Sequence, residues 1–204
     1  VVVLICLIGI FGQCGKKSDD SSKDSNSKTS IAENTKENNS SVDTKEKNNE
    51  ESSEEKKQQT KSNDLIIYTT AEMAERYYNI LVEDMAGLET GESTLLDVYS
   101  TCEDLKEYMP KYSDHLDEVE DDTAKDYIKA VNNYVWNIYT ISDNLIEHIN
   151  ENKMSALSDA KDGISLSSTY ALKVVSERTN YLSQAGFTTD EIIEIMDVKS
   201  DNEA

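Results

Sequence analysis

Four stretches of this chain after Asp64 repeat apolar residues at alternating spacings of three and four. This spacing places the repeated side chains on one stripe of an α-helix, and over several heptads it is typical of helices packed nearly parallel or antiparallel. No stretch shows a convincing period of two, which a half-buried β-strand requires. The four stripes are Ile67, Ala71, Ala74, Tyr78, Leu81, Met85 and Leu88; Leu95, Val98, Cys102, Leu105, Met109, Tyr112, Leu116 and Val119; Ala124, Ile128, Val131, Val135, Ile138, Ser142, Leu145 and Ile149; and Leu157, Ala160, Ile164, Ser167, Ala171, Val174, Arg178, Tyr181 and Ala185.

Residues suited to helix ends separate these stretches. Gly91 can adopt the left-handed conformation that ends a helix, and Thr94 with Asp97 forms a capping pair for the next one. Asn152 fits the end of the third helix, and Gly186, followed by an apolar residue, fits a Schellman end for the fourth. Further helix starts are expected at Asp122 or Thr123, at Ser155 and at Thr189. The sequence therefore predicts an all-α fold, an up-down-up-down four-helix bundle with a short C-terminal helix over residues 64–204.

Two residues interrupt the helical pattern. Pro110 lies inside the second stretch, where it removes a hydrogen bond, so it either kinks that helix or breaks it. Because the heptad phase continues across it, we expect a kink. Gly163 and the serines after it are poor helix formers, so a start near Ile164 is the alternative to the start at Ser155 for the fourth helix.

The segment 15–63 has the composition of a linker. Ser, Asn, Asp, Glu, Lys and Thr dominate it, and its large aliphatic residues are Ile31 and Val42. Such a segment buries too little apolar surface to offset the entropy lost on ordering, so we expect it to be disordered.

The first residues carry a localisation signal. An apolar run extends from Val1 to Phe11, and Cys14 follows it, directly before the polar segment. This beginning resembles a Gram-positive bacterial membrane lipoprotein, in which a peptidase cuts before a lipid-modified cysteine. The resemblance implies a signal peptide at 1–13, lipidation of Cys14 at the head of a linker over 14–63, and a place on the outer face of the cell membrane. A signal cut elsewhere and an uncleaved anchor are the alternatives, because Phe11 and Gln13 depart from the residues usual at such a site.

Charge is concentrated in the predicted bundle. Residues 15–63 hold 10 Lys and 11 Asp or Glu, a net charge of −1, whereas residues 64–204 hold 10 Lys or Arg and 30 Asp or Glu, a net charge of −20. Such a domain repels phosphate backbones, which argues against a nucleic-acid partner and leaves proteins or other partners of positive charge. High charge also serves solubility alone.

The chain lacks residue patterns that carry catalysis or bind a metal. It has no phosphate-binding loop, no Gly-x-Ser-x-Gly and no zinc spacing, and neither His115 nor His148 has a carboxylate three residues before it. We therefore expect no enzyme activity, no cofactor and no metal. The acidic run 114–122 could form a weak Ca²⁺ site, but a solvated acidic end of the bundle explains it more simply. Cys102 is the third cysteine and would have no disulfide partner in the mature domain.

Four residues are candidates for ligand binding: Arg178, Ser167, Trp136 and Tyr134. Arg178 lies on an apolar stripe, so it either pairs with a carboxylate of a neighbouring helix or faces an anionic ligand, with Ser167 nearby. Trp136 and Tyr134 belong to a Tyr-rich region that could bind sugars or peptides, or could simply pack at the core boundary. We predict an extracytoplasmic binding or interaction module. A sensor or accessory subunit of a membrane complex and a passive spacer are the alternatives. A groove lined by Tyr and Arg178 would favour ligand binding, whereas a fully packed bundle with only an acidic outer face would favour partner docking or a spacer.

Overall fold

The computed structural model describes residues 43–197, with side chains from residue 53 onward. This part of the chain is all-α and contains no strand. Its helices are α2 (Asp43–Thr90), α3 (Leu95–Leu116), α4 (Lys125–Glu151), α5 (Met154–Gln184) and α6 (Thr189–Asp197), with the short 3-10 helix η2 (Asp122–Ala124) before α4. The predicted signal peptide at 1–13, Cys14 and the first part of the predicted linker lie outside the described residues.

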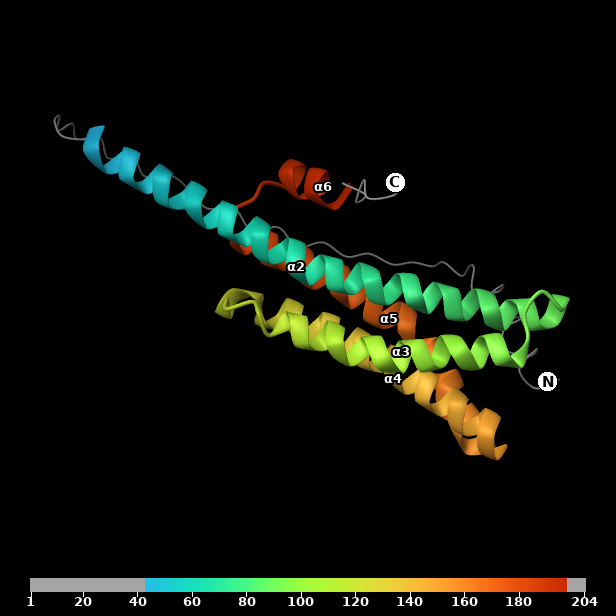
Figure 1. The fold of residues 1–204 in the computed structure, drawn as a ribbon. Helices are drawn as coiled ribbons and strands as arrows, with labels where there is room; N and C mark the ends of the chain where they lie inside the picture. Colours follow the sequence, from blue (N-terminus) through green and yellow to red (C-terminus); the bar gives the residue numbers. More distant parts are fainter. Residues whose placement is uncertain (1–42, 198–204) are drawn as a thin grey trace, which may run out of the picture.

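The long helices pack around one apolar core. Helix α2 contacts α3, α4 and α5, and α4 also packs against α3 and α5. Figure 1 shows α2 extending past the ends of α3 and α5, with its first part lying near α6. The predicted stripes supply most of the core, including the buried residues Leu81, Leu105, Val135 and Val174. Leu95 is an exception, because it lies in the first turn of α3 and is 45% exposed.

Helix α2 begins far earlier than predicted. The expected boundary between residues 63 and 64 falls inside it, because the helix starts at Asp43. Thr60 and Asn63 are buried, and the ammonium of Lys57 lies 3.0 Å from Glu191 of α6 and 5.0 Å from the ring centroid of Phe187. The linker prediction rested on the small number of aliphatic residues in the segment. It therefore missed polar residues that contact side chains distant in the sequence.

The predicted helix ends between α2 and α3, after α4 and after α5 are confirmed. Gly91 has φ +80° and Asn152 has φ +53°, both in the left-handed region. Thr94 and Asp97 form the predicted reciprocal cap at the start of α3. Gly186 has φ +89°, and the residue after it donates its N–H to the carbonyl of Leu182 in the Schellman pattern. Short connections therefore follow each of these helices.

The beginnings of α4 and α5 differ from the prediction. Asp121, rather than Asp122 or Thr123, caps η2. Helix α4 follows η2 directly and begins at Lys125. Helix α5 begins at Met154 after Lys153, so Ser155 is not its cap and Ile164 is not its start. Pro110 lies inside α3, which continues to Leu116 without a break.

Gly163 has a packing role that the sequence did not reveal. A Cβ atom at this position would lie 2.6 Å from Cγ1 of Ile141 on α4, which is closer than such atoms approach. The amide of Asn137 also donates a hydrogen bond of 3.1 Å to the Gly163 carbonyl. The missing side chain allows α4 and α5 to approach closely, and this contact compensates for the low helix propensity of glycine.

Candidate groove between α2 and α5

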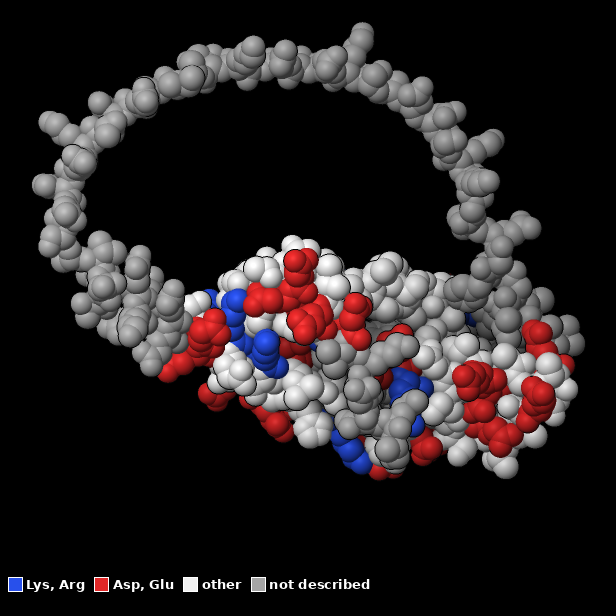
Figure 2. Space-filling model, turned by 90° about the horizontal axis from the view of Figure 1, so that it is seen from above, with Lys and Arg blue, Asp and Glu red and all other residues white. Residues whose placement is uncertain are grey.

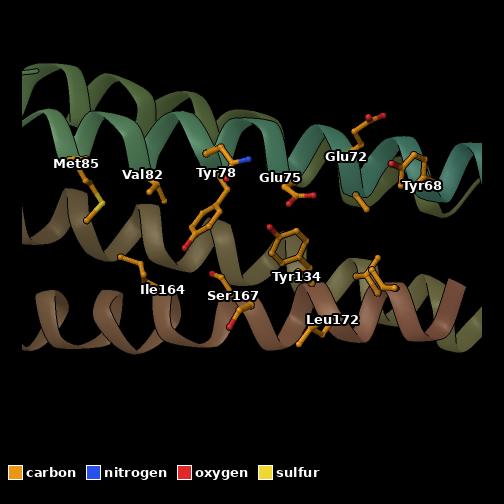
Figure 3. Close-up of a pocket in the computed structure, with 17 residues that line it drawn as sticks. Tyr68, Glu72, Glu75, Tyr78, Val82, Met85, Tyr134, Ile164, Ser167 and Leu172 are labelled. Atoms are coloured by element: carbon orange, nitrogen blue, oxygen red, sulfur yellow. The ribbon is translucent and has the colours of Figure 1, made fainter. Parts of the chain in front are cut away.

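A groove of about 730 Å³ runs between α2 and α5, with one residue of α4 at its floor. Its volume lies in the range of small-ligand sites in proteins, roughly 300–1,000 Å³. Figure 3 shows α2 along one side, α5 along the other, and Tyr134 of α4 between them. The lining residues are Tyr68, Ala71, Glu72, Glu75, Tyr78, Asn79, Val82, Met85 and Ala86 of α2, Tyr134 of α4, and Ile164, Ser167, Ser168, Ala171, Leu172, Val174 and Val175 of α5.

The apolar part of the groove includes side chains that face water. Leu172 is 72% exposed, Val175 is 49% exposed and Val82 is 40% exposed. Single exposed aliphatic residues are ordinary, but these three line one concave surface on two helices. The groove is thus an apolar surface that a ligand could cover.

Polar groups lie at the middle of the groove. Asn137 donates a hydrogen bond of 3.0 Å to the Ser167 hydroxyl, which lies 3.1 Å from the Gly163 carbonyl and donates to it. Burial raises the pKa of Tyr78, and burial followed by the charge of Glu75 raises the pKa of Tyr134. Both phenols therefore stay neutral near pH 7, and each can donate a hydrogen bond to a ligand while its ring makes apolar contact.

The charge of the groove is negative. Glu72 and Glu75 line it, and none of the described lining residues is Lys, Arg or His. Glu75 is directed toward the groove in Figure 3, whereas Glu72 points outward from α2. Acidic side chains also outnumber basic ones on the face shown in Figure 2. A cationic or neutral ligand fits this environment better than an anion.

Arg178 does not line the groove. It is 5% exposed, and its guanidinium donates from Nε to Oδ1 of Asp64 at 3.0 Å and from Nη2 to Oδ2 at 2.9 Å. Its Cζ also lies 3.7 Å from the ring centroid of Tyr68, which does line the groove. Of the two predicted roles, this geometry matches pairing with a carboxylate of a neighbouring helix.

A partly buried polar cluster includes Asn63, the residue before Asp64. The Tyr181 hydroxyl donates to Oδ2 of Asp121 at 2.8 Å, and Asn63 donates to the same oxygen at 3.3 Å. The hydroxyl of Tyr127 is buried and has no hydrogen-bond partner among the described residues. These contacts join the early part of α2 to α5 and to the segment before α4, so they stabilise the region beside the groove.

The other predicted candidates divide between the groove and the surface. Ser167 and Tyr134 line the groove. Trp136 lies elsewhere on α4, 44% exposed and in an edge contact with Tyr139 at 5.1 Å between ring centroids. The sequence reasoning missed Glu75 and Leu172. The sequence does contain a signal for the α2 side of the groove. Beside the core stripe of α2, a second set of residues also steps alternately by four and three, namely Tyr68, Glu72, Glu75, Asn79, Val82 and Ala86.

Cysteine and carboxylate groups outside the groove offer little chemistry. Burial raises the pKa of the Cys102 thiol to about 12, so it is protonated near pH 7 and a poor nucleophile. Within residues 43–197 no cluster of three or more His, Cys, Asp or Glu side chains has the arrangement of a metal site.

No helix in this same part of the chain is both long and apolar enough to cross a membrane. Known family models, curated proteins and solved structures give no match to this chain.

Proposed function

We propose that this chain is a lipid-anchored, extracytoplasmic binding module whose ligand occupies the groove between α2 and α5. In this proposal α2 to α5 form an up-down-up-down four-helix bundle, and the bundle acts by binding rather than by catalysis. The groove is the observation that carries the proposal. It combines three exposed aliphatic residues with phenol, amide and hydroxyl groups on one concave surface.

A binding role accounts for the groove better than a spacer role does. Apolar side chains left in contact with water forgo the free energy that burial would supply, about 25 cal/mol per Å². A spacer would gain nothing from leaving Leu172 and Val175 uncovered along a hollow. A ligand that covers them recovers this free energy, which makes binding the natural use of the surface.

The location rests on the beginning of the sequence. The apolar run that ends before Cys14 motivates the anchor, and the anchor would hold the domain on the outer face of the cell membrane. Mass spectrometry of the mature protein tests this part directly. A diacylglyceryl group on Cys14 would support it, and an unmodified N-terminus at another residue would overturn it.

A sensor or accessory subunit is the second candidate. Helix α2 lines the groove between Tyr68 and Ala86 and continues without interruption back to Asp43. A helix that contacts a ligand and leads back in sequence toward Cys14 could carry a change in position to a membrane partner. Like the first candidate, this one binds a ligand in the groove, and it adds a membrane protein as a second partner.

Photocrosslinking in intact bacterial cells tests the groove as the ligand site. A photoreactive phenylalanine analogue would replace Leu172, which lines the groove, or Leu166, which lies on α5 outside it and is 47% exposed. We expect a defined adduct from position 172 and none of the same mass from position 166. Equal adducts at both positions, or none at position 172, would remove the support for a groove ligand.

A further inference from the structure

The two sides of the groove repeat at heptad spacing. Along α2 the lining residues Tyr68, Glu72, Glu75, Asn79, Val82 and Ala86 step alternately by four and three. Along α5 the lining residues Ser168, Leu172 and Val175 step by four and then three. Each helix therefore presents, beside its core stripe, a second stripe toward the groove.

Such a pair of stripes is the surface against which another helix packs. Side chains of an incoming helix at alternating spacings of three and four fill the spaces between side chains of the two facing helices. The α2 stripe extends from Tyr68 to Ala86, which corresponds to about 27 Å at 1.5 Å per residue. A helix of roughly 18 residues matches this length.

The negative charge of the groove indicates which residues should lie beside the apolar stripe of a bound helix. Glu75 points toward the groove, Glu72 lies on its edge, and the described lining residues contribute no positive charge. The domain sequence over 64–204 carries a net charge of −20, so an acidic helix would be repelled over the whole approach. Lys or Arg beside the apolar stripe of the ligand would meet the Glu75 carboxylate.

A plain acyl chain fits this surface less well. It would place methylene groups against Glu75 and Asn79 without offering either a hydrogen bond, and burying a carboxylate without a partner is costly. A cationic helix covers Val82, Leu172 and Val175 with its apolar side chains and pairs the Glu75 carboxylate with a basic one. Both the exposed aliphatic side chains and the negative charge of the groove then contribute to binding.

Building on the proposed function, we propose that the groove binds a cationic amphipathic α-helix of a partner protein or peptide. The apolar stripe of that helix lies between α2 and α5, and its Lys or Arg side chains face Glu75. This is helix-in-groove recognition, in which apolar residues at i, i+3, i+4 and i+7 serve as anchors.

Three designed peptides of about 18 residues test the class of ligand. The first has Leu at the heptad stripe and Lys beside it, the second replaces Lys by Glu, and the third keeps the composition of the first in an order without helical periodicity. Each labelled peptide is titrated with the full-length protein and followed by fluorescence anisotropy. We expect the first to bind at least about tenfold more tightly than the other two, and more weakly as salt is raised.

Matched variants locate the binding on the protein. Leu172→Arg and Glu75→Lys place positive charge in the groove, whereas Leu166→Arg and Glu83→Lys make the same changes at exposed positions of the same helices outside it. Each groove variant should weaken the first peptide by about fivefold or more, and each control should leave it within about twofold. Equal weakening by a groove variant and its control would show attraction to the overall charge and would overturn the proposal.

A neutral apolar dye separates failure of this inference from failure of the proposed function. If the dye binds the full-length protein and Leu172→Arg displaces it, while no peptide binds selectively, the groove is a ligand site and the helical ligand is wrong. If neither dye nor peptide depends on Leu172, both proposals fail. Concentration-dependent dimerisation that Leu172→Arg abolishes, without selective peptide binding, would show that a second copy fills the groove and would also overturn the helical ligand.

Discussion

Removing the charge of Arg178 alone should destabilise the protein strongly. Arg178 and Asp64 are 5% and 3% exposed, and two short hydrogen bonds join them. Arg178→Met would leave the Asp64 carboxylate buried without its cation. Breaking a buried pair in this way costs about 3–5 kcal/mol. At roughly 2–4 °C per kcal/mol for a chain of this size, the melting temperature should fall by about 6–20 °C.

Replacing both partners should cost much less. In the double variant Arg178→Met with Asp64→Leu, no buried charge is left behind, so the free energy of unfolding should return close to that of the wild type or exceed it. Arg178→Lys is an informative intermediate, because it keeps the charge but cannot form both hydrogen bonds in the same plane. The double-mutant cycle measures the coupling between the two side chains.

Thermal and urea unfolding, followed by circular dichroism, would measure these effects. Lys125→Met provides the control, since Lys125 pairs with Asp122 at the surface, where their side chains are 73% and 91% exposed. That change should alter stability by no more than about 1 kcal/mol. An Arg178→Met protein that melts like the wild type would refute the reasoning, because it would mean that Asp64 has no need of its buried partner.

Three further predictions concern the core, the helix contact and α6. Leu105→Ala should cost about 2–5 kcal/mol in urea unfolding, because Leu105 is fully buried. Gly163→Ala should lower the melting temperature despite the better helix propensity of Ala, since its Cβ would press on α4. For Glu191, a hydrogen bond from the backbone of Thr188, and then Lys57, lower the pKa from 4.5 to about 2. A lowered folded-state pKa means that this stabilising contribution is present above pH 4.5 and is lost as the pH falls toward 2, which an NMR titration of Glu191 would follow.

Each of these has an outcome that would contradict it. Glu83→Ala is the surface control for Leu105→Ala and should fall within about 0.5 kcal/mol of the wild type, so equal losses would deny the burial of Leu105. A Gly163→Ala protein more stable than the wild type would show that propensity outweighs the contact with Ile141. A Glu191 carboxyl that titrates near 4.5 would mean that its contacts do not persist in solution.

The core could be predicted because its residues follow one local rule. Leu81, Leu105, Val135 and Val174 were placed by alternating spacing alone, and all four are buried. The helix ends at Gly91 and Gly186 were predictable for the same reason, because the left-handed conformation is a local demand on the backbone.

What the sequence did not reveal depends on contacts between distant residues. Residues 57–63 read as linker, and the contact between Lys57 and Glu191 crosses 134 positions. Gly163 reads as a poor helix residue until Ile141 is seen beside it. The groove depends on how far apart α2 and α5 lie, and a periodic pattern does not contain that distance.

Methyl NMR of the full-length protein, titrated with the neutral apolar dye, tests the central claim most directly. If the groove is the ligand site, the methyl resonances of Val82, Leu172 and Val175 should shift together in a saturable way. Those of Leu166 and Leu96, which are 47% and 73% exposed outside the groove, should stay in place. Shifts confined to Leu166 and Leu96, or equal small shifts at all five residues, would contradict the assignment of this groove as the binding site.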